Sequence, residues 1–141
     1  MGKETVIVDG TVAVSAAAAV SPAPATLHVT ATAAANTAVT ATLPAAGVGL
    51  FHYITSIEIT RNATAAVAGS ATLIHTSTNL PGDPAWSVGN AIAAGGTEKD
   101  VRYEPCRPLK SSVANTATTI VAPAAGAACL TRINVSYYTG T

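Results

Sequence analysis

The chain has 141 residues, with seven basic and seven acidic side chains and a formal net charge of zero at pH 7. This length is that of one domain with room for a hydrophobic core. Only 10% of the residues are charged and 4% are aromatic. Such a composition provides few groups for catalysis, and its scattered basic residues do not form the positive surface of a nucleic-acid-binding protein. We therefore predict a single structural or interaction domain over residues 1–141 that is not an enzyme, needs no cofactor and does not bind nucleic acid directly.

The first 25 residues combine a turn signal with a run of small residues. Asp9-Gly10 lies between two alternating stretches, Thr5–Val8 and Thr11–Val14, and this arrangement predicts a hairpin followed by a flexible arm. Val12–Val20 is similar to the apolar core of a signal peptide, but acidic residues stand where such peptides carry positive charge, so secretion is the less favoured interpretation. No stretch is long and apolar enough to span a bilayer, and we expect no membrane partner.

Alternation of apolar and polar residues continues along most of the remaining chain. This period of two predicts β-strands, and the Thr, Val, Gly and Pro residues that interrupt the alanine runs argue against helices. Turn residues separate the strands at short intervals. The expected strands are Leu27–Thr32, Ala38–Leu43, Phe51–Arg61, Ala71–Thr78, Val88–Ala93, Asp100–Glu104, Thr116–Ala122 and Thr131–Tyr138.

Many short strands with turn residues between them indicate an all-β fold, most simply an antiparallel β-sandwich. About eight strands in this length favour a single jelly roll. An immunoglobulin-like sandwich is the alternative, but its usual order of cysteine, tryptophan and cysteine is missing, because Trp86 precedes both Cys106 and Cys129.

Two of the expected strands allow faces to be assigned. In Thr131–Tyr138, the alternation places Ile133, Val135 and Tyr137 on one face, toward the core. The strand Phe51–Arg61 divides in the same way, and we expect the face that carries Ile57 to be buried. The two predicted sets are Tyr53, Thr55, Ile57, Ile59 and Arg61 on that face, and His52, Ile54, Ser56, Glu58 and Thr60 on the other.

The histidines and cysteines are too dispersed to indicate a catalytic or metal site. His28, His52 and His75 lie in separate expected strands without metal-ligand spacing, so we predict surface or partly buried residues. Cys106 and Cys129 are too few for a disulfide framework. They could pair if their strands are adjacent, and are more simply small buried side chains.

The acidic residues also lack a catalytic arrangement. Glu98, Asp100 and Glu104 are expected to form a solvated sheet edge together with Lys99 and Arg102. We therefore predict no catalytic, cofactor-binding or metal-binding residues.

The stretch Asn79–Trp86 is the best candidate for a contact site. Two prolines and a glycine make it a rigid loop beside the only tryptophan of the chain, so little entropy would be lost on binding. In the alternative interpretation, this tryptophan closes one end of the sandwich. The candidate interface residues are Leu80, Pro81, Asp83, Pro84, Trp86 and Phe51.

From Phe51 onward the sequence resembles a protein family. The segments HYITSIEITRNATA, TSTNLPGDPAW and PLKSSVANTATTIVAPAAGAACLTRINVSYYTGT, within a small Ala- and Thr-rich β chain, are similar to the decoration or cement proteins of tailed-bacteriophage capsids. The resemblance implies a virion protein on the outer surface of an icosahedral capsid. It would hold neighbouring capsomers together against the pressure of packaged DNA, with the major capsid protein as partner and with self-association as a homodimer.

Two other functions remain open from the sequence. One is a head-fibre or tail-associated receptor-binding module, and the other is a secreted adhesin module. Sugar binding would favour several exposed aromatic side chains around one pocket, whereas the aromatic residues of this chain are spread along the sequence.

Overall fold

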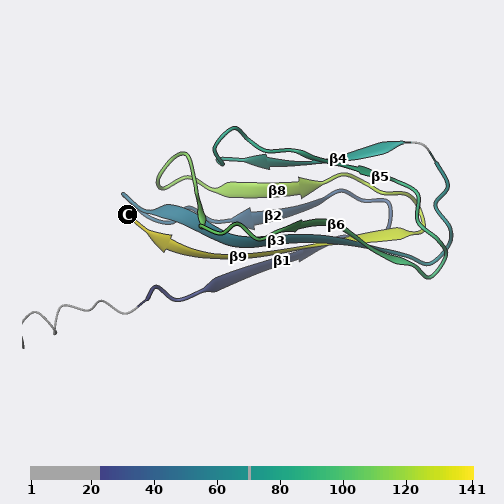
Figure 1. Ribbon diagram of the computed structural model, residues 1–141, viewed down its shortest axis with the longest axis horizontal. Coiled ribbons are helices and arrows are strands. Elements are labelled where there is room, and N and C mark those ends of the chain that lie inside the picture. The colour runs from purple at the N-terminus through teal and green to yellow at the C-terminus, as the bar shows by residue number, and fades with distance from the viewer. Residues whose placement is uncertain (1–22, 70) are drawn as a thin grey trace, which may run out of the picture.

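The computed structural model describes residues 23–69 and 71–141 (Figure 1). The hairpin predicted within residues 5–14 lies outside these ranges. No helix in the described residues is long and apolar enough to span a membrane. The strands are β1 (Leu27–Thr32), β2 (Val39–Leu43), β3 (Phe51–Ala63), β4 (Thr72–Thr78), β5 (Trp86–Gly89), β6 (Thr97–Tyr103), β7 (Leu109–Lys110), β8 (Thr118–Ala122) and β9 (Cys129–Gly140).

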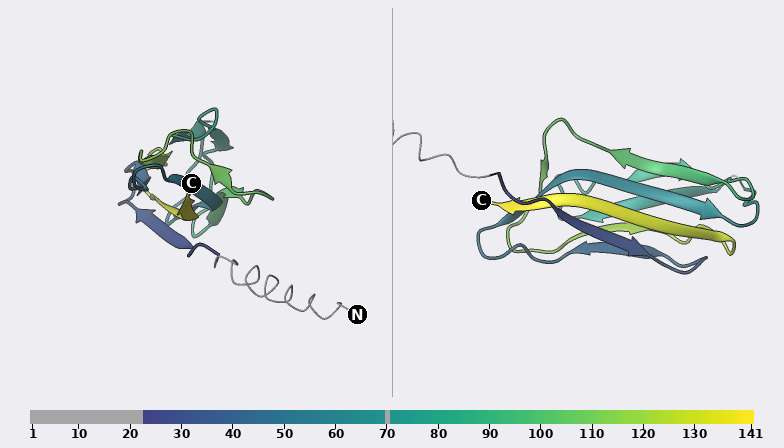
Figure 2. Two further views of the ribbon diagram at one scale, coloured as in Figure 1. Left: turned by 90° about the vertical axis from the view of Figure 1, so that its left-hand side faces the viewer. Right: turned by 90° about the horizontal axis from the view of Figure 1, so that it is seen from below.

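These strands form two antiparallel sheets that pack face to face, which confirms the β-sandwich (Figures 1 and 2). One sheet has the order β1-β9-β3-β6, with the short β7 also paired to β3, and the other has the order β2-β8-β4-β5. The immunoglobulin arrangement does not fit this order. That fold places its first two strands in one sheet, whereas β1 and β2, the first two strands of the described residues, lie in different sheets.

The strand pairs are nested in sequence. β1 pairs with β9, β2 with β8, β3 with β6, and β4 with β5, as in one long hairpin wrapped around a core. This path brings loops 44–50, 79–85 and 104–117 and the C-terminal residues to the same end of the sandwich, on the left in Figure 1. We call this end the tip. Loops 33–38, 90–96 and 123–128 lie at the opposite end.

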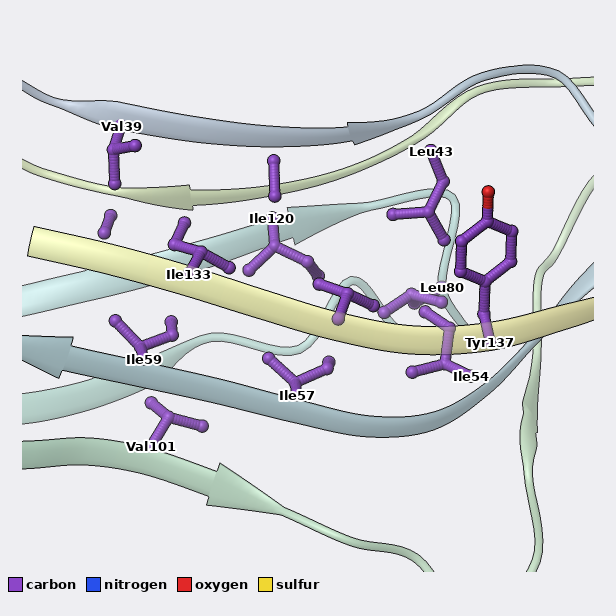
Figure 3. Close-up of a cluster of buried hydrophobic side chains, with 13 residues drawn as sticks. Val39, Leu43, Ile54, Ile57, Ile59, Leu80, Val101, Ile120, Ile133 and Tyr137 are labelled. Atoms are coloured by element: carbon purple, nitrogen blue, oxygen red, sulfur yellow. The ribbon is translucent and has the colours of Figure 1, made fainter. Parts of the chain in front are cut away.

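The core fills the space between the sheets with alternate residues of the central strands (Figure 3). Ile133 and Val135 of β9 face inward as their alternation predicts, and Ile120 of β8 meets them from the other sheet. Branched aliphatic residues dominate this layer, so it supplies much of the apolar burial in a chain otherwise rich in alanine.

A β-bulge alters the predicted faces of β3. Its register with β9 shifts between Ile54 and Ser56, and Thr55 is the extra residue. The shift turns His52 and Ile54 inward, onto the face that carries Ile57. The expectation that Tyr53 and Thr55 share the buried face was therefore wrong, because strict alternation does not hold across a bulge.

One strand is misplaced by the sequence pattern. β5 covers Trp86–Gly89, not Val88–Ala93. The carbonyl groups of Gly89 and Asn90 accept hydrogen bonds from a buried arginine side chain. The arginine is distant in the sequence, and a local apolar pattern cannot reveal such a long-range partner.

Candidate binding surface

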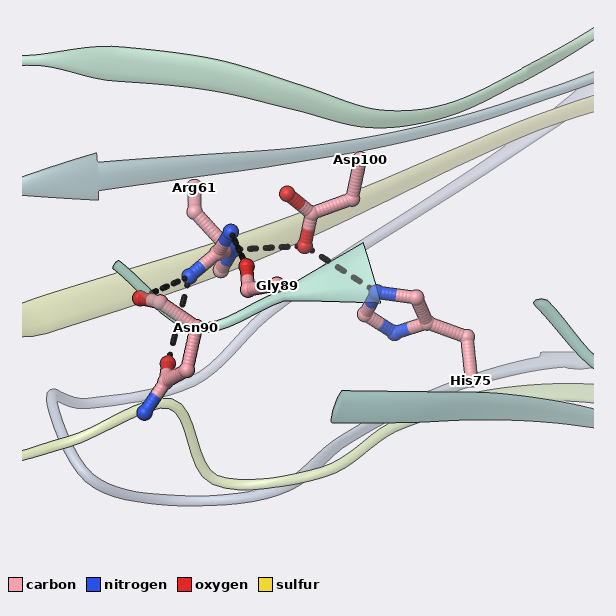
Figure 4. A network of polar contacts seen from close by, with 5 residues as sticks. All are labelled: Arg61, His75, Gly89, Asn90 and Asp100. Atoms are coloured by element: carbon pink, nitrogen blue, oxygen red, sulfur yellow. Dashed lines mark hydrogen bonds and ion pairs between the residues drawn. The ribbon is translucent and has the colours of Figure 1, made fainter. Parts of the chain in front are cut away.

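The strongest polar interactions lie inside the sandwich (Figure 4). The Arg61 Nε donates to the Asp100 Oδ2 at 2.6 Å, and the His75 Nε2 lies 3.0 Å from the same oxygen. The side chains of Arg61, Asp100 and His75 are 2%, 1% and 0% exposed. Because Arg61 and Asp100 come from one sheet and His75 from the other, this network joins the two sheets.

The two terminal nitrogens of Arg61 also have hydrogen-bond partners. One terminal nitrogen donates to the backbone oxygen of Asn90 at 2.9 Å and to its side-chain oxygen at 3.3 Å, and the other donates to the Gly89 oxygen at 2.9 Å. In contrast, the His75 Nδ1 is buried without a hydrogen-bond partner. The network is enclosed, so its main physical effect is to hold the strands in place.

The position of Asp100 corrects a prediction from the sequence. Glu98, Lys99, Arg102 and Glu104 are exposed as expected, but the Asp100 side chain is buried. The register between β3 and β6 shifts so that Asp100 has no paired residue on β3. This second bulge turns the carboxylate inward, which simple alternation could not predict.

Two of the three histidines are buried, contrary to the prediction. Besides His75, His52 lies in the interior, where its Nε2 contacts the Pro44 oxygen at 2.8 Å and its Nδ1 contacts the Thr118 Oγ1 at 2.9 Å. His28 is exposed and pairs with Ser136. His52 is therefore a second polar link between the sheets, because Thr118 belongs to β8.

The two cysteines are both free, and only one is buried. Cys106 is exposed and Cys129 is buried, so the interpretation of both as buried side chains holds for Cys129 alone. Burial raises the pKa of the Cys129 thiol, and the nearby Arg61 charge opposes that rise. In the described part of the chain, no cluster of three or more His, Cys, Asp or Glu side chains could hold a metal ion.

The predicted contact loop lies at the tip, but its residues differ in exposure. Leu80 is only 1% exposed and belongs to the core, so its assignment as an interface residue was wrong: its apolar side chain fills the end of the sandwich. Pro81 and Asp83 are exposed, and Pro84 is half-buried. The loop thus presents a short exposed turn anchored by a buried leucine.

Trp86 is half-buried and packs against the core. Its ring centroid lies 6.3 Å from that of Tyr103. The two residues belong to the edge strands β5 and β6 of opposite sheets, so they close one side of the sandwich. This position agrees with the alternative interpretation of Trp86 as a closing residue.

A solvent-open hollow of about 440 Å³ lies between loop 79–85 and loop 111–117. Asn79 holds the two loops together: its Oδ1 accepts from the Val113 backbone N–H at 2.8 Å, and its Nδ2 donates to the Thr116 oxygen at 3.1 Å. Sequence reasoning singled out the first loop but not the second. No motif in residues 111–117 indicates that they pack beside it. The hollow is lined by Thr78, Asn79, Leu80, Gly82, Asp83, Ser112, Val113, Thr116 and Ala117.

Half of the aromatic residues gather on the outer face of the β1-β9-β3-β6 sheet near the tip. The Tyr53 and Tyr138 rings are stacked with centroids 5.0 Å apart, and the Lys110 Nζ lies 3.9 Å from the centroid of the Phe51 ring. Phe51 is thus half-buried under a lysine, beside two residues that the sequence did not assign to the interface. A Cβ atom at Gly140 would come within 3.3 Å of Tyr53, so glycine leaves room for the stack.

Large apolar side chains are also exposed at the tip. Val48 is 91% exposed and Val113 is 56% exposed, and Leu27 begins β1 at the same end. A surface that combines exposed valines, clustered aromatic rings and a preformed hollow is suited to protein contact. Comparisons of the chain with protein-family models, with curated proteins and with solved structures find no match.

Proposed function

We propose that this protein is a non-enzymatic virion protein that cements the outer surface of an icosahedral phage capsid. The single observation that carries the proposal is the apolar tip, with Val48 91% exposed on an otherwise well-packed sandwich. Such side chains lose water on contact with a partner, which favours association. The resemblance to phage decoration proteins provides the identity of the partner, the major capsid protein.

The nested strand pairing supports a jelly roll as the specific form of the sandwich. In this proposal the sheets form a rigid body, held by the core and by the two polar links through His52 and His75. A rigid body loses little conformational entropy on binding. Many copies on one shell, each a homodimer, then stabilise the expanded state by acting together, because binding to one conformation favours that conformation.

Co-sedimentation with empty phage shells tests this function. The purified protein is mixed with expanded shells and, separately, with unexpanded shells, and the bound protein is compared with the major capsid protein. Saturable binding to expanded shells at a fixed ratio is expected. Absence of binding to both kinds of shell would refute the cementing role.

A pair of variants tests whether the tip is the contact surface. Val113→Asp places a charge at the tip, and Ile74→Asp places one on β4, at a side chain that is 53% exposed compared with 56% for Val113. We expect Val113→Asp to reduce shell binding at least tenfold and Ile74→Asp to leave it unchanged. Melting curves must show that both variants are folded, and equal shell binding by both would rule out the tip.

The aromatic cluster favours a second candidate function, a receptor-binding module of the phage head or tail. Phe51, Tyr53 and Tyr138 lie together although they are far apart in the sequence. Aromatic rings commonly form contact sites for receptors. Binding of the isolated protein to glycans, lost in Tyr138→Ala, would favour this function over capsid cementing.

A further inference from the structure

We propose that the hollow at the tip binds a basic side chain, lysine or arginine, of the partner protein. This inference rests on the proposed function for the existence of a protein partner, and it specifies the chemistry that the partner presents. The hollow has an apolar floor, a single charged group and walls that are already in place.

The floor and one wall are apolar. Leu80 is buried beneath the hollow, while Val113 and Ala117 line it from the facing loop. Methylene groups of a long side chain could lie along the exposed Val113 and Ala117 and be removed from water. At about 440 Å³ the hollow is near the lower end of the range of about 300–1,000 Å³ that is usual for ligand sites, which suits one side chain and its neighbouring backbone.

Asp83 is the only charged residue that lines the hollow. Within residues 23–69 and 71–141, its carboxylate forms no hydrogen bond or ion pair, whereas Asp100, Glu58 and Glu104 each have a cationic neighbour. A hollow with apolar side chains along one wall and one free carboxylate is complementary to a side chain with an aliphatic stem and a positive head group. Lysine and arginine have this form, and arginine can also contact both carboxylate oxygens.

The walls are fixed before any partner binds. The Asn79 side chain bonds to Val113 and Thr116 of the facing loop and to Thr118 at the start of β8. The Ser112 N–H donates to the Asn79 backbone oxygen at 3.0 Å. These contacts keep the hollow open without a ligand, so binding need not order the loops.

Titration of the full-length ¹⁵N-labelled protein with short peptides tests the proposal. The probes are acetyl-Gly-X-Gly-amide peptides in which X is lysine, arginine, norleucine or glutamate, added to millimolar concentration. We expect the amide signals of Gly82, Val113 and Ala117 to shift with lysine and arginine, less with norleucine and not with glutamate. Added salt should weaken the lysine and arginine complexes but not the norleucine complex.

Two variants separate the charge from the fold. Asp83→Asn is expected to weaken lysine-peptide binding about two- to fivefold, the range for an exposed ion pair, and to remove the preference for lysine over norleucine. Glu98→Gln removes an exposed carboxylate at the opposite end and should change nothing. Equal binding of lysine and norleucine peptides to the unmodified protein, or no shifts around the hollow with any peptide, would overturn the inference.

This test is independent of the shell-binding experiment. If the lysine peptide binds at the hollow and shells do not bind, the capsid function fails and the basic-side-chain site stands. If shells bind but Asp83→Asn has no effect on peptides or shells, the inference fails and the proposed function stands.

Discussion

Replacing Asp100 with alanine should strongly destabilise the sandwich. Arg61 would keep its charge in the interior and lose the carboxylate that lies 2.6 Å from its Nε. Its remaining partners, the oxygen atoms of Gly89 and Asn90, carry no net charge. Removal of one partner from a buried ion pair costs about 3–5 kcal/mol. At roughly 3–4 °C per kcal/mol for a domain of this size, the melting temperature should fall by about 10–20 °C.

Urea unfolding measures this loss, because Trp86 is the only tryptophan and its fluorescence reports on the packed edge of the sandwich. Glu98→Gln, which alters an exposed carboxylate on the same strand, should stay within about 0.5 kcal/mol of the unmodified protein. The double variant Arg61→Met/Asp100→Ala no longer contains the lone buried charge. It should therefore be at least about 1 kcal/mol more stable than the sum of its single variants predicts.

The reasoning would be refuted if Asp100→Ala lost less than about 1 kcal/mol. That result would mean that the backbone oxygens around Arg61 are sufficient to stabilise its charge. A large loss with strictly additive single variants would place the effect in packing and not in the ion pair.

Ile57→Asp and Val135→Asp should each abolish the cooperative melting transition in circular dichroism, since a carboxylate would be buried without a partner; melting like that of the unmodified protein would show that these side chains are not in the core. Trp86→Ala should lower the free energy of unfolding in urea by about 2 kcal/mol, less than the ~3–5 kcal/mol expected for a fully buried tryptophan. If the variant instead kept its stability and bound shells more weakly, Trp86 would be a contact residue. Thiol labelling should modify Cys106 in the native protein and Cys129 only after unfolding. Folding raises the pKa of the Cys129 thiol, so keeping this thiol protonated stabilises the folded state. This stabilisation is complete below the ordinary thiol pKa of about 8.5 and is lost as the pH rises further. In Cys129→Ala, the free energy of unfolding should therefore decline less at alkaline pH than in the unmodified protein.

The strands of this protein could be predicted from the sequence because their alternation is local. Leu27–Thr32 agrees with β1 at both ends, and the inward face of β9 follows from Ile133 and Val135. The features that could not be predicted are those that depend on which strands pair with each other. Thr55 and Asp100 are extra residues at bulges, and a bulge is defined by the partner strand, which a single sequence does not specify.

The candidate surface was less predictable than the fold, for a related reason. Asp83 and Phe51 were singled out from the sequence because one lies in a Pro- and Gly-rich loop and the other is aromatic. Val113 and Tyr138 were missed because their importance comes from neighbours distant in sequence, the Asn79 side chain and the Tyr53 ring. Leu80 was misassigned since nothing in its loop distinguishes a leucine that anchors the turn from one that projects outward.

The nested pairing of the strands has a consequence for how the protein is made. β9 lies between β1 and β3, so β1 finds its sheet partner only after the residues up to Tyr137 have been synthesised. Until then the ribosome-bound chain exposes unpaired strand edges, which is the condition under which β-rich chains aggregate. Such distant pairing also makes folding slow. The yield of soluble protein should therefore depend on how quickly β9 leaves the ribosome and docks between β1 and β3, more than on the strength of any single contact in the finished sandwich.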